Sequence, residues 1–486
     1  MSVSSHLKRY GPLVLAALLG LGVRLLPAGQ SLGGDDGVSL YYCGKDWATM
    51  FQRMAVSGEP NPPLYFMWLH AWLLALGPHL AMSEVWLRMA SIVWGVLTIP
   101  VVWAVAGEAL GETEANIAAL FMAVCSFHVE FCEELRMYAM PTLWAALAMW
   151  GVWRLPQDGG WRYALGAVLC VYTHYLTGFL LLGLHLIVLL KRDYPWKRLL
   201  LMDLVATVAF APWLPHVLAQ SGDSAYFGLR GLPPGAWFPE VLWQLSFGWA
   251  WPLPLAGWGH QGLAPVKWVG VAVLAGAICL GLRRRKEADG IVAAWLGGAM
   301  AFSLFSIWGI SRFTHERIFE YKYFCMLTPC LAVLVGWALP RLRKPFGWAM
   351  AVVLFGMNLY SLSLLSFDPA LGQADWRGAC QYLAKEVGAG DEILAQPGMY
   401  AGVMSYYLSQ YRLPQGVRLN PTNEMPQDTV VAKHVWTCVA PYHPMALQHS
   451  TDAWLEHAGY RAGSLPPVEY GNFFPANAIR VQDWQR

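Results

Sequence analysis

The sequence predicts a polytopic α-helical membrane protein with about eleven transmembrane helices, additional interfacial helices and a small C-terminal α/β domain. Of the 486 residues, 56% are hydrophobic and only 13% are charged, whereas a soluble domain carries roughly 25% charged residues. The apolar residues also come in blocks close to the roughly 20 residues that a membrane helix needs. The net charge of +2 favours no nucleic-acid partner.

The first apolar block, residues 10–27, follows Lys8 and Arg9. A basic start is also typical of a secretory signal peptide, but no convincing small-x-small cleavage site follows, so a retained first span is expected. Two blocks rich in Trp, Pro and Gly, 62–77 and 237–256, are expected to lie at the membrane interface. The other spans are expected near residues 86–106, 115–131, 138–153, 163–173, 176–190, 199–217, 266–282, 291–310, 323–339 and 346–365.

Lysine and arginine orient these spans, because cytoplasmic loops carry the excess of positive charge. Alternate connections are basic, apart from residues 107–114. This pattern predicts a cytoplasmic N-terminus in the cell inner (plasma) membrane and a periplasmic or extracellular C-terminal domain. The basic connections hold Lys8 and Arg9; Arg154 and Arg162; Lys191, Arg192, Lys197 and Arg198; Arg283, Arg284, Arg285 and Lys286; and Arg341, Arg343 and Lys344.

The remaining connections collect polar motifs at the predicted outer ends of the spans. A transporter is expected to place its functional polar groups near the bilayer midplane, on broken helices. Their gathering at the ends of spans indicates a site at the outer interface instead. The motifs lie at Asp35-Asp36, Asn61-Pro62-Pro63, Glu133–Arg136, Thr173–Tyr175 and 312–322.

The chain becomes more polar after about Phe367, which predicts a transmembrane domain over 1–366 and a soluble domain over 367–486. Within the second domain, a helix is expected from Asp375, strands at 392–396 and 429–439, and a helix near 453–458, the alternation typical of an α/β fold. Outside the cytoplasm, Cys380 and Cys438 are permitted to form a disulfide. Two buried thiols are an equal alternative, because spacing alone does not give pairing geometry.

The glycine-flanked pair Asp35-Asp36 directly follows the first span. Two adjacent carboxylates near a membrane surface suit a general base or a divalent-cation site. The alternative is an ordinary solvated turn, since Asp and Gly are turn residues. The position of the pair among the other outer motifs favours the functional interpretation.

Two basic side chains at predicted outer ends suit a phosphate ligand. The planar fork of Arg136 can bind phosphate bidentately, and the alternative is an internal Glu–Arg pair that fixes helix packing. Lys322 offers a second cation, or else only extends to the interface. His174 is interpreted as a substrate contact, although a lone histidine is more often a packing residue.

Arg312 and Arg317 make a predicted outer loop basic, which favours an anionic headgroup nearby. Asn61 precedes two prolines and would start an interfacial helix, because proline is tolerated in a first helical turn. A structural role explains most of that motif.

Taken in order, these motifs resemble those of the GT-C membrane glycosyltransferases. The closer likeness is to the bacterial branch related to protein O-mannosyltransferases and the lipid A aminoarabinose transferase. The resemblance covers most of the chain. It departs from the family pattern at three positions: Asp36 stands where Glu is usual, Asn61 where His or Lys is usual, and Lys322 where Arg is usual. The matching segments are Asp35-Asp36 before Gly37–Tyr41, Asn61–Tyr65, Ser83–Arg88, Glu133–Ala139, Thr173–Tyr175, Lys322-Tyr323 and Asp375–Arg377.

The resemblance implies transfer of a sugar from a polyprenyl-phosphate donor to a hydroxyl of a glycan, glycolipid or protein. In this hypothesis Asp35 and Asp36 are the catalytic pair, with Asp35 the general base and inversion the expected outcome. Arg136, Lys322 and His174 bind the donor phosphate. An optional Mg²⁺ or Mn²⁺ would bind Asp35 and Asp36, but no cofactor is required. The residues expected to contact or orient substrates are Glu134, Tyr138, Asn61, Tyr175, Arg312 and Arg317.

Two rival functions suit the same composition. A transporter or flippase of lipid-linked sugars would move its substrate without cleaving a glycosyl–phosphate bond. A non-catalytic scaffold in envelope assembly would use the outer domain to bind a partner. The clustering of carboxylates at the predicted outer ends favours the transferase.

Overall fold

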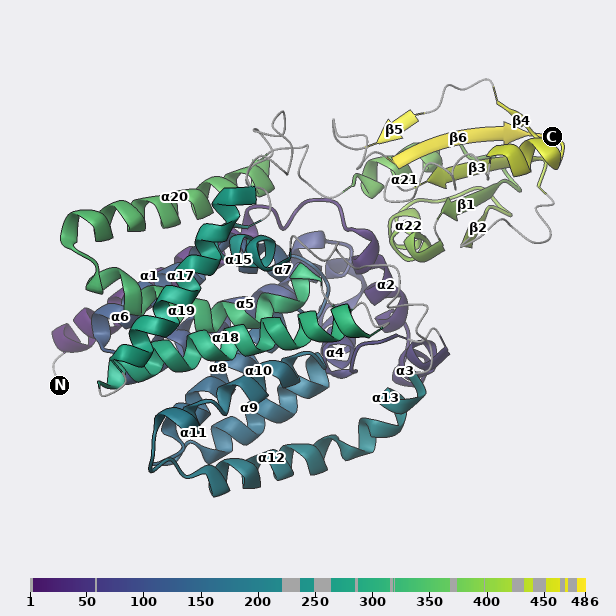
Figure 1. The fold of residues 1–486 in the computed structure, drawn as a ribbon. Helices are drawn as coiled ribbons and strands as arrows, with labels where there is room; N and C mark the ends of the chain where they lie inside the picture. The colour runs from purple at the N-terminus through teal and green to yellow at the C-terminus, as the bar shows by residue number, and fades with distance from the viewer. Residues whose placement is uncertain are drawn as a thin grey trace.

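The computed structural model shows a bundle of helices with a β-sheet at one end of it (Figure 1). We call this end of the bundle the site end. The described residues are 3–56, 59–220, 237–248, 264–284, 287–314, 318, 320–367, 374–396, 398–421, 432–439, 452–463, 468–470 and 479–486.

The helices of the bundle follow one another with short connections. They are α1 (Val3–Leu25), α2 (Gly34–Cys43), α3 (Trp47–Val56), α4 (Leu64–Leu80), α5 (Glu84–Ala109), α6 (Glu112–Val124), α7 (Ser126–Cys132), α8 (Ala139–Arg154), α9 (Gly160–Thr173), α10 (Thr177–Leu184), α11 (Ile187–Leu190), α12 (Trp196–Phe210), η1 (Ala211–Trp213), α13 (Leu214–Gln220), α15 (Trp237–Phe247), α17 (Ala264–Arg283), α18 (Ala288–Phe313), η3 (Tyr321–Leu327), α19 (Thr328–Ala338), η4 (Leu339–Arg341) and α20 (Lys344–Phe367).

Five helical segments in the described chain are long and apolar enough to cross a membrane, and the bent pair α6–α7 makes six if it is one span. The predicted number of about eleven is higher, because several predicted spans fold into short helices. The helices α8, α9 and α10 contain 16, 14 and 8 residues. The five segments are α5, Trp196–Leu218, α18, Tyr321–Arg341 and α20.

A buried arginine from the first helix stabilises the break between α6 and α7. The two helices meet at an angle of 52°, with Cys125 in a non-helical conformation between them. The guanidinium of Arg24 donates to the carbonyl oxygens of Ala123 (2.9 Å) and Met122 (3.2 Å), which belong to the last turn of α6. It thus satisfies carbonyl groups that a helix end leaves without partners, and α7 is redirected toward the site end.

The C-terminal residues form a mixed sheet with strand order β2-β1-β3-β6-β4, and β5 pairs with β6. Strand β1 is parallel to β2 and β3, whereas β6 is antiparallel to β3. The strands are β1 (Glu392–Gln396), β2 (Arg418–Pro421), β3 (His434–Val439), β4 (Arg461–Ala462), β5 (Val468–Tyr470) and β6 (Ile479–Gln485), with helices α21 (Trp376–Glu386) and α22 (Ala401–Leu408) and the short η5 (Gly398–Tyr400).

Several predictions for this region are confirmed. Strand β1 has the predicted bounds, residues 452–457 are helical, and the helix predicted from Asp375 begins one residue later because Asp375 caps it. The Asp375 carboxylate accepts a hydrogen bond from the Gly378 N–H group (2.9 Å). The second predicted strand begins at His434, and its residues 429–431 lie outside the described residues. Cys380 and Cys438 are both free and buried, which is the second of the two alternatives.

The sheet domain packs directly against α2, the helix that begins with the aspartate pair. Backbones meet where α2 crosses α22, because a Cβ atom at Gly402 would overlap the carbonyl oxygen of Gly37. On the same side, the hydroxyl of Tyr407 accepts a hydrogen bond from the Leu32 N–H group (2.8 Å), and Arg377 donates to the Gly29 carbonyl oxygen (2.7 Å). The segment before α2 is therefore held by the sheet domain.

The close approach of α2 and α22 predicts that Gly402→Ala destabilises the protein. An added methyl group would push the two backbones apart, at a cost of about 1–3 kcal/mol in the free energy of unfolding. Thermal unfolding in detergent should show a lower Tm than for the wild type. Gly356→Ala is the matched control, because that helical glycine has open space around it; equal Tm values for the two variants would contradict the tight contact.

Candidate active site

Asp35 lies in the first turn of α2, where an acidic side chain interacts favourably with the helix dipole. The helix begins here because Gly33 is extended (φ −88°, ψ 177°) and donates its N–H group to Asp36 Oδ2 (2.8 Å). The side chain of Asp35 keeps 24% of its surface exposed. Of the two adjacent carboxylates, it is therefore the one that a substrate can reach.

Asp36 points inward and joins two segments of the chain. Its Oδ1 atom accepts a hydrogen bond from the Leu135 N–H group (2.7 Å), and its Oδ2 atom lies 3.9 Å from a guanidinium nitrogen of Arg88. Burial raises the pKa of the Asp36 carboxyl, while Arg88 and the two backbone N–H groups oppose the shift. Asp36 thereby fixes the start of α2 against the segment that carries Arg136.

Arg88, in α5, is almost completely buried and binds both of these segments through their backbone. Its Nε atom donates to the carbonyl oxygen of Glu133 (2.8 Å), and its Nη atoms donate to those of Ala28 (2.8 Å), Gln30 and Ser31 (2.9 Å). A guanidinium offers five donors in a fixed plane, so one side chain can hold the loop before α2 and the loop after α7 together.

Five side chains from four segments form a line of alternating charge, which we call the ion chain: Glu59, Arg136, Asp35, Lys322 and Glu320. Asp35 lies in the middle, with Oδ1 3.6 Å from Arg136 Nη2 and Oδ2 3.3 Å from Lys322 Nζ. Arg136 Nη1 lies 3.8 Å from Glu59 Oε2, and Lys322 Nζ lies 3.7 Å from Glu320 Oε1. The structure thus brings together three residues predicted from three distant motifs.

The two outer carboxylates of the ion chain were not predicted. Glu59 is buried and accepts hydrogen bonds from the Asn61 backbone N–H group (3.3 Å) and side-chain amide. The predicted residue Asn61 is thus linked to Arg136 through Glu59. The signal in the sequence was proximity, since Glu59 and Glu320 each lie two positions before a predicted site residue.

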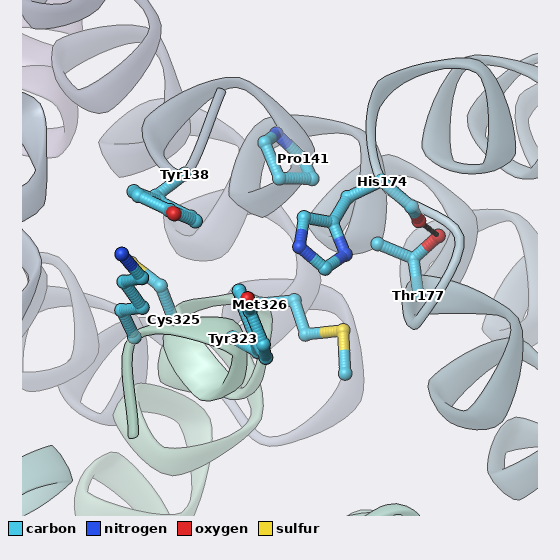
Figure 2. Close-up of a pocket in the computed structure, with 8 residues that line it drawn as sticks. Tyr138, Pro141, His174, Thr177, Tyr323, Cys325 and Met326 are labelled. Atoms are coloured by element: carbon cyan, nitrogen blue, oxygen red, sulfur yellow. Dashed lines mark hydrogen bonds between the residues drawn. The ribbon is translucent and has the colours of Figure 1, made fainter. Parts of the chain in front are cut away.

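Beside Lys322 lies a small pocket built from α8, α10 and η3 (Figure 2). Tyr138 and His174 face it from opposite sides, with Tyr323 and Met326 between them. The Lys322 ammonium lies 5.4 Å from the centre of the Tyr138 ring, a cation–π distance. The pocket is lined by Tyr138, Pro141, His174, Thr177, Lys322, Tyr323, Cys325 and Met326.

His174 presents a neutral hydrogen-bond donor to this pocket. Its Nδ1 atom accepts from the Leu176 N–H group (3.3 Å), which assigns the ring proton to Nε2. That Nε2 atom is buried without a hydrogen-bond partner in the described part of the chain. Burial lowers the pKa of His174 to about 3, with Lys322 adding to the shift, so the ring stays uncharged at neutral pH.

Glu134 is a half-buried acid beside the ion chain, with its Oε2 atom buried. Burial raises the pKa of its carboxyl to about 8; Asp35 and Asp36 add to the shift, whereas Lys322 opposes it. The Oε2 atom has no hydrogen-bond partner among the described residues. At neutral pH the side chain is therefore predominantly a neutral acid with a proton to donate.

Three other predicted residues remain, of which Tyr175 lies near enough to Glu59 of the ion chain for that carboxylate to act on its hydroxyl. The Tyr175 hydroxyl accepts a hydrogen bond from Trp213 Nε1 (2.8 Å). Arg312 is exposed at the end of α18, with its guanidinium over the Phe313 ring. Arg317 lies outside the described residues.

The aspartate pair does not fit the optional divalent-cation site. Both oxygens of Asp36 accept backbone N–H groups, and the two oxygens of Asp35 face Arg136 and Lys322. Across the described residues, no group of three or more His, Cys, Asp or Glu side chains is arranged to hold a metal ion.

Comparison with known proteins gives one family match and several similar folds. Residues 62–218 match the family model described as dolichyl-phosphate-mannose-protein mannosyltransferase, whereas no curated protein sequence matches. The fold is similar to that of ArnT from Cupriavidus metallidurans bound to undecaprenyl phosphate, with a TM-score of 0.57 and 15% identity over 98% of both chains. The apo state of the same protein gives 0.56 and 16%, over 97% of this chain and 98% of that one.

A second similar fold is the archaeal oligosaccharyltransferase AglB from Archaeoglobus fulgidus, in complex with an inhibitory peptide and a dolichol-phosphate. Its TM-score is 0.52 at 12% identity, over 99% of this chain and 74% of that one. At these identities the structures establish a shared fold. Together with the family match, they confirm the predicted resemblance to the GT-C membrane glycosyltransferases. The chain is a multi-pass membrane protein with the fold of ArnT, and its residues 62–218 match the mannosyltransferase family.

The raised pKa of Glu134 predicts that stability falls at alkaline pH. An acid whose folded pKa (about 8) exceeds its unfolded value (4.5) stabilises the fold fully below pH 4.5, and this contribution is lost as pH rises through 8. Glu134→Gln keeps the neutral form, so its Tm in detergent should exceed that of the wild type increasingly between pH 6 and 9. The corresponding difference in the free energy of unfolding should be on the order of a few kcal/mol.

Glu456→Gln is the control, because that side chain is exposed and its removal should leave the pH profile of the Tm unchanged. A Glu134→Gln profile parallel to the wild-type profile across this range would show that Glu134 is ionised in the folded protein.

Proposed function

We propose that this membrane protein is a glycosyltransferase that moves a sugar from a polyprenyl-phosphate donor to an acceptor hydroxyl, with inversion at the anomeric carbon. The observation that carries the proposal is the position of Asp35 between Arg136 and Lys322, since Lys322 also lines a pocket together with His174. A base, two cations and a neutral donor are the groups that such a transfer needs. The acceptor is a glycan, a glycolipid or a protein.

Asp35 is proposed as the general base. It is the exposed member of the aspartate pair, and two neighbouring cations favour its ionised form. The carboxylate takes the proton from the acceptor hydroxyl as the acceptor oxygen bonds to the anomeric carbon. The bond from that carbon to the phosphate oxygen breaks, and its electron pair leaves with the lipid phosphate. Attack opposite the leaving phosphate inverts the configuration.

Arg136, Lys322 and His174 are proposed to bind the phosphate. Both cations are largely buried, with 7% and 11% of their side-chain surface exposed, and charges act more strongly in a site that excludes water. The Nε2–H group of His174 has no hydrogen-bond partner among the described residues and would donate to a phosphate oxygen. Because this ring is neutral, it would contribute direction rather than charge.

Glu134 and Asp36 are proposed to position the reacting groups. Asp36 has both oxygens committed to backbone N–H groups, so its role would be to hold Asp35 in place. Glu134, as a neutral acid beside Asp35, would orient an acceptor or phosphate oxygen by donating its proton in a hydrogen bond.

The site end is proposed to face the outside of the cell, with residues 1–366 in the membrane and 367–486 as an outer domain. In support, arginines of the predicted cytoplasmic connections form ion pairs with acidic residues of neighbouring connections, away from the ion chain. Arg341 bridges Glu114 and Asp289, and Arg154 pairs with Glu108. These ion pairs bring the connections together at one end of the bundle, and the basic residues there favour a cytoplasmic location for that end.

Asp35→Asn should abolish sugar release while leaving the protein folded. Loss of a general base lowers the rate by about 10²- to 10⁴-fold. The measurement is release of label by purified protein from a panel of radiolabelled polyprenyl-phosphate sugars, with a membrane extract as the source of acceptors. Donor consumption by the wild type would also name the sugar.

Asp193→Asn is the matched control, since it removes an exposed carboxylate in a predicted cytoplasmic connection and should leave activity unchanged. A folded Asp35→Asn protein as active as the wild type would rule out Asp35 as the base. If the wild type consumed no donor but moved it across a vesicle membrane, a flippase would replace the transferase, and activity that depended on a partner complex would favour the scaffold.

A further inference from the structure

In the proposed function, the same two cations interact with two anions, the Asp35 carboxylate and the donor phosphate. Arg136 and Lys322 are the proposed ligands of the donor phosphate, yet in the structure each already faces one oxygen of Asp35. A carboxylate held by two cations is a poor proton acceptor, because its ionised form is stabilised. The base and the phosphate therefore have opposing demands on these side chains.

The distances in the ion chain show that these pairs are loose. Strong charge-assisted hydrogen bonds between nitrogen and oxygen measure about 2.7–2.9 Å. Arg136 instead lies 3.6 Å from Asp35 and 3.8 Å from Glu59, and Lys322 lies 3.3 Å from Asp35 and 3.7 Å from Glu320. Each cation is thus placed between two carboxylates, so that it can move away from Asp35 without losing every anionic partner.

We infer that Asp35 and the lipid phosphate compete for Arg136 and Lys322, so that the base is held in ion pairs until the donor binds. This inference rests on the proposed function. A bound phosphate draws the two cations toward its own oxygens and leaves Asp35 free to accept the acceptor's proton. The base thus becomes active only when there is a sugar to transfer.

The coupling must act in both directions, because linkage between two ligands is reciprocal. If phosphate binding raises the proton affinity of Asp35, then the charge of Asp35 weakens phosphate binding by the same factor. The charged and titratable groups that face Asp35 are Arg136, Lys322, Asp36, Glu134 and Tyr138. Of these, only Arg136 and Lys322 are cations that a phosphate can take.

The inference predicts that Asp35→Asn, although inactive, binds undecaprenyl phosphate more tightly than the wild type. One opposite charge at this distance shifts a proton affinity by a factor of ten or more, so the Kd should fall by about tenfold. The measurement is the Kd of undecaprenyl phosphate for purified protein in nanodiscs at constant pH. Asp193→Asn should match the wild type, and Glu59→Gln, which releases Arg136 from its other carboxylate, should also lower the Kd.

A double-mutant cycle separates competition from simple repulsion between two anions. In a Lys322→Gln background, competition predicts that Asp35→Asn gains several-fold less affinity, whereas repulsion predicts an undiminished gain. The inference would be overturned by an undiminished gain in the Lys322→Gln background, or by a Kd of Asp35→Asn equal to or higher than that of the wild type. The transferase proposal would still stand in that case if the wild type consumed a donor. If the wild type did not bind undecaprenyl phosphate, both would fail.

Discussion

The geometry of this site depends on one buried carboxylate, that of Asp36. It accepts backbone hydrogen bonds from the start of α2 and from Leu135, and it lies against Arg88, whose guanidinium binds the carbonyl groups of both segments. Removing one partner of such a buried pair leaves an uncompensated polar group, which costs about 3–5 kcal/mol. Because α2 and the loop after α7 meet here, Asp35 and Arg136 come within reach of one another.

Neighbouring residues of the same type thus have different roles, because their side chains point in different directions from one helical turn. Asp36 is buried and committed to the backbone, while Asp35 is partly exposed and faces two side-chain cations. The charged residues around Asp35 would be costly to bury singly. Alternating signs along the ion chain offset that cost, and they leave the central carboxylate as the position where charge can change during a reaction.

The sequence predicted the membrane class, Asp35, Arg136 and Lys322, and the first strand of the C-terminal sheet, because each has a local signal. Glu59 and Glu320 had no signal beyond their proximity to predicted residues, because an acidic residue in a loop is ordinarily solvated; the folded chain shows that these two face the predicted cations. The number of spans was less predictable, because a break at Cys125 divides the apolar stretch predicted at 115–131 into two shorter helices. Hydropathy depends on side-chain composition and does not indicate where a helix breaks.

The clamping of α2 indicates which part of the site stays fixed and which part moves. Arg88 holds the segment before α2 from the bundle side, and Arg377 and Tyr407 hold it from the sheet domain, so the position of Asp35 is set from both sides. Arg136 instead lies between α7 and α8, outside regular helix, and Lys322 lies in the 3₁₀ turn η3. Such 3₁₀ turns are frequent at helix ends, and this one directly precedes α19, so neither cation is held within an α-helix. A fixed base between two more adaptable cations is the arrangement in which a phosphate can take the cations while the base stays aligned with the acceptor.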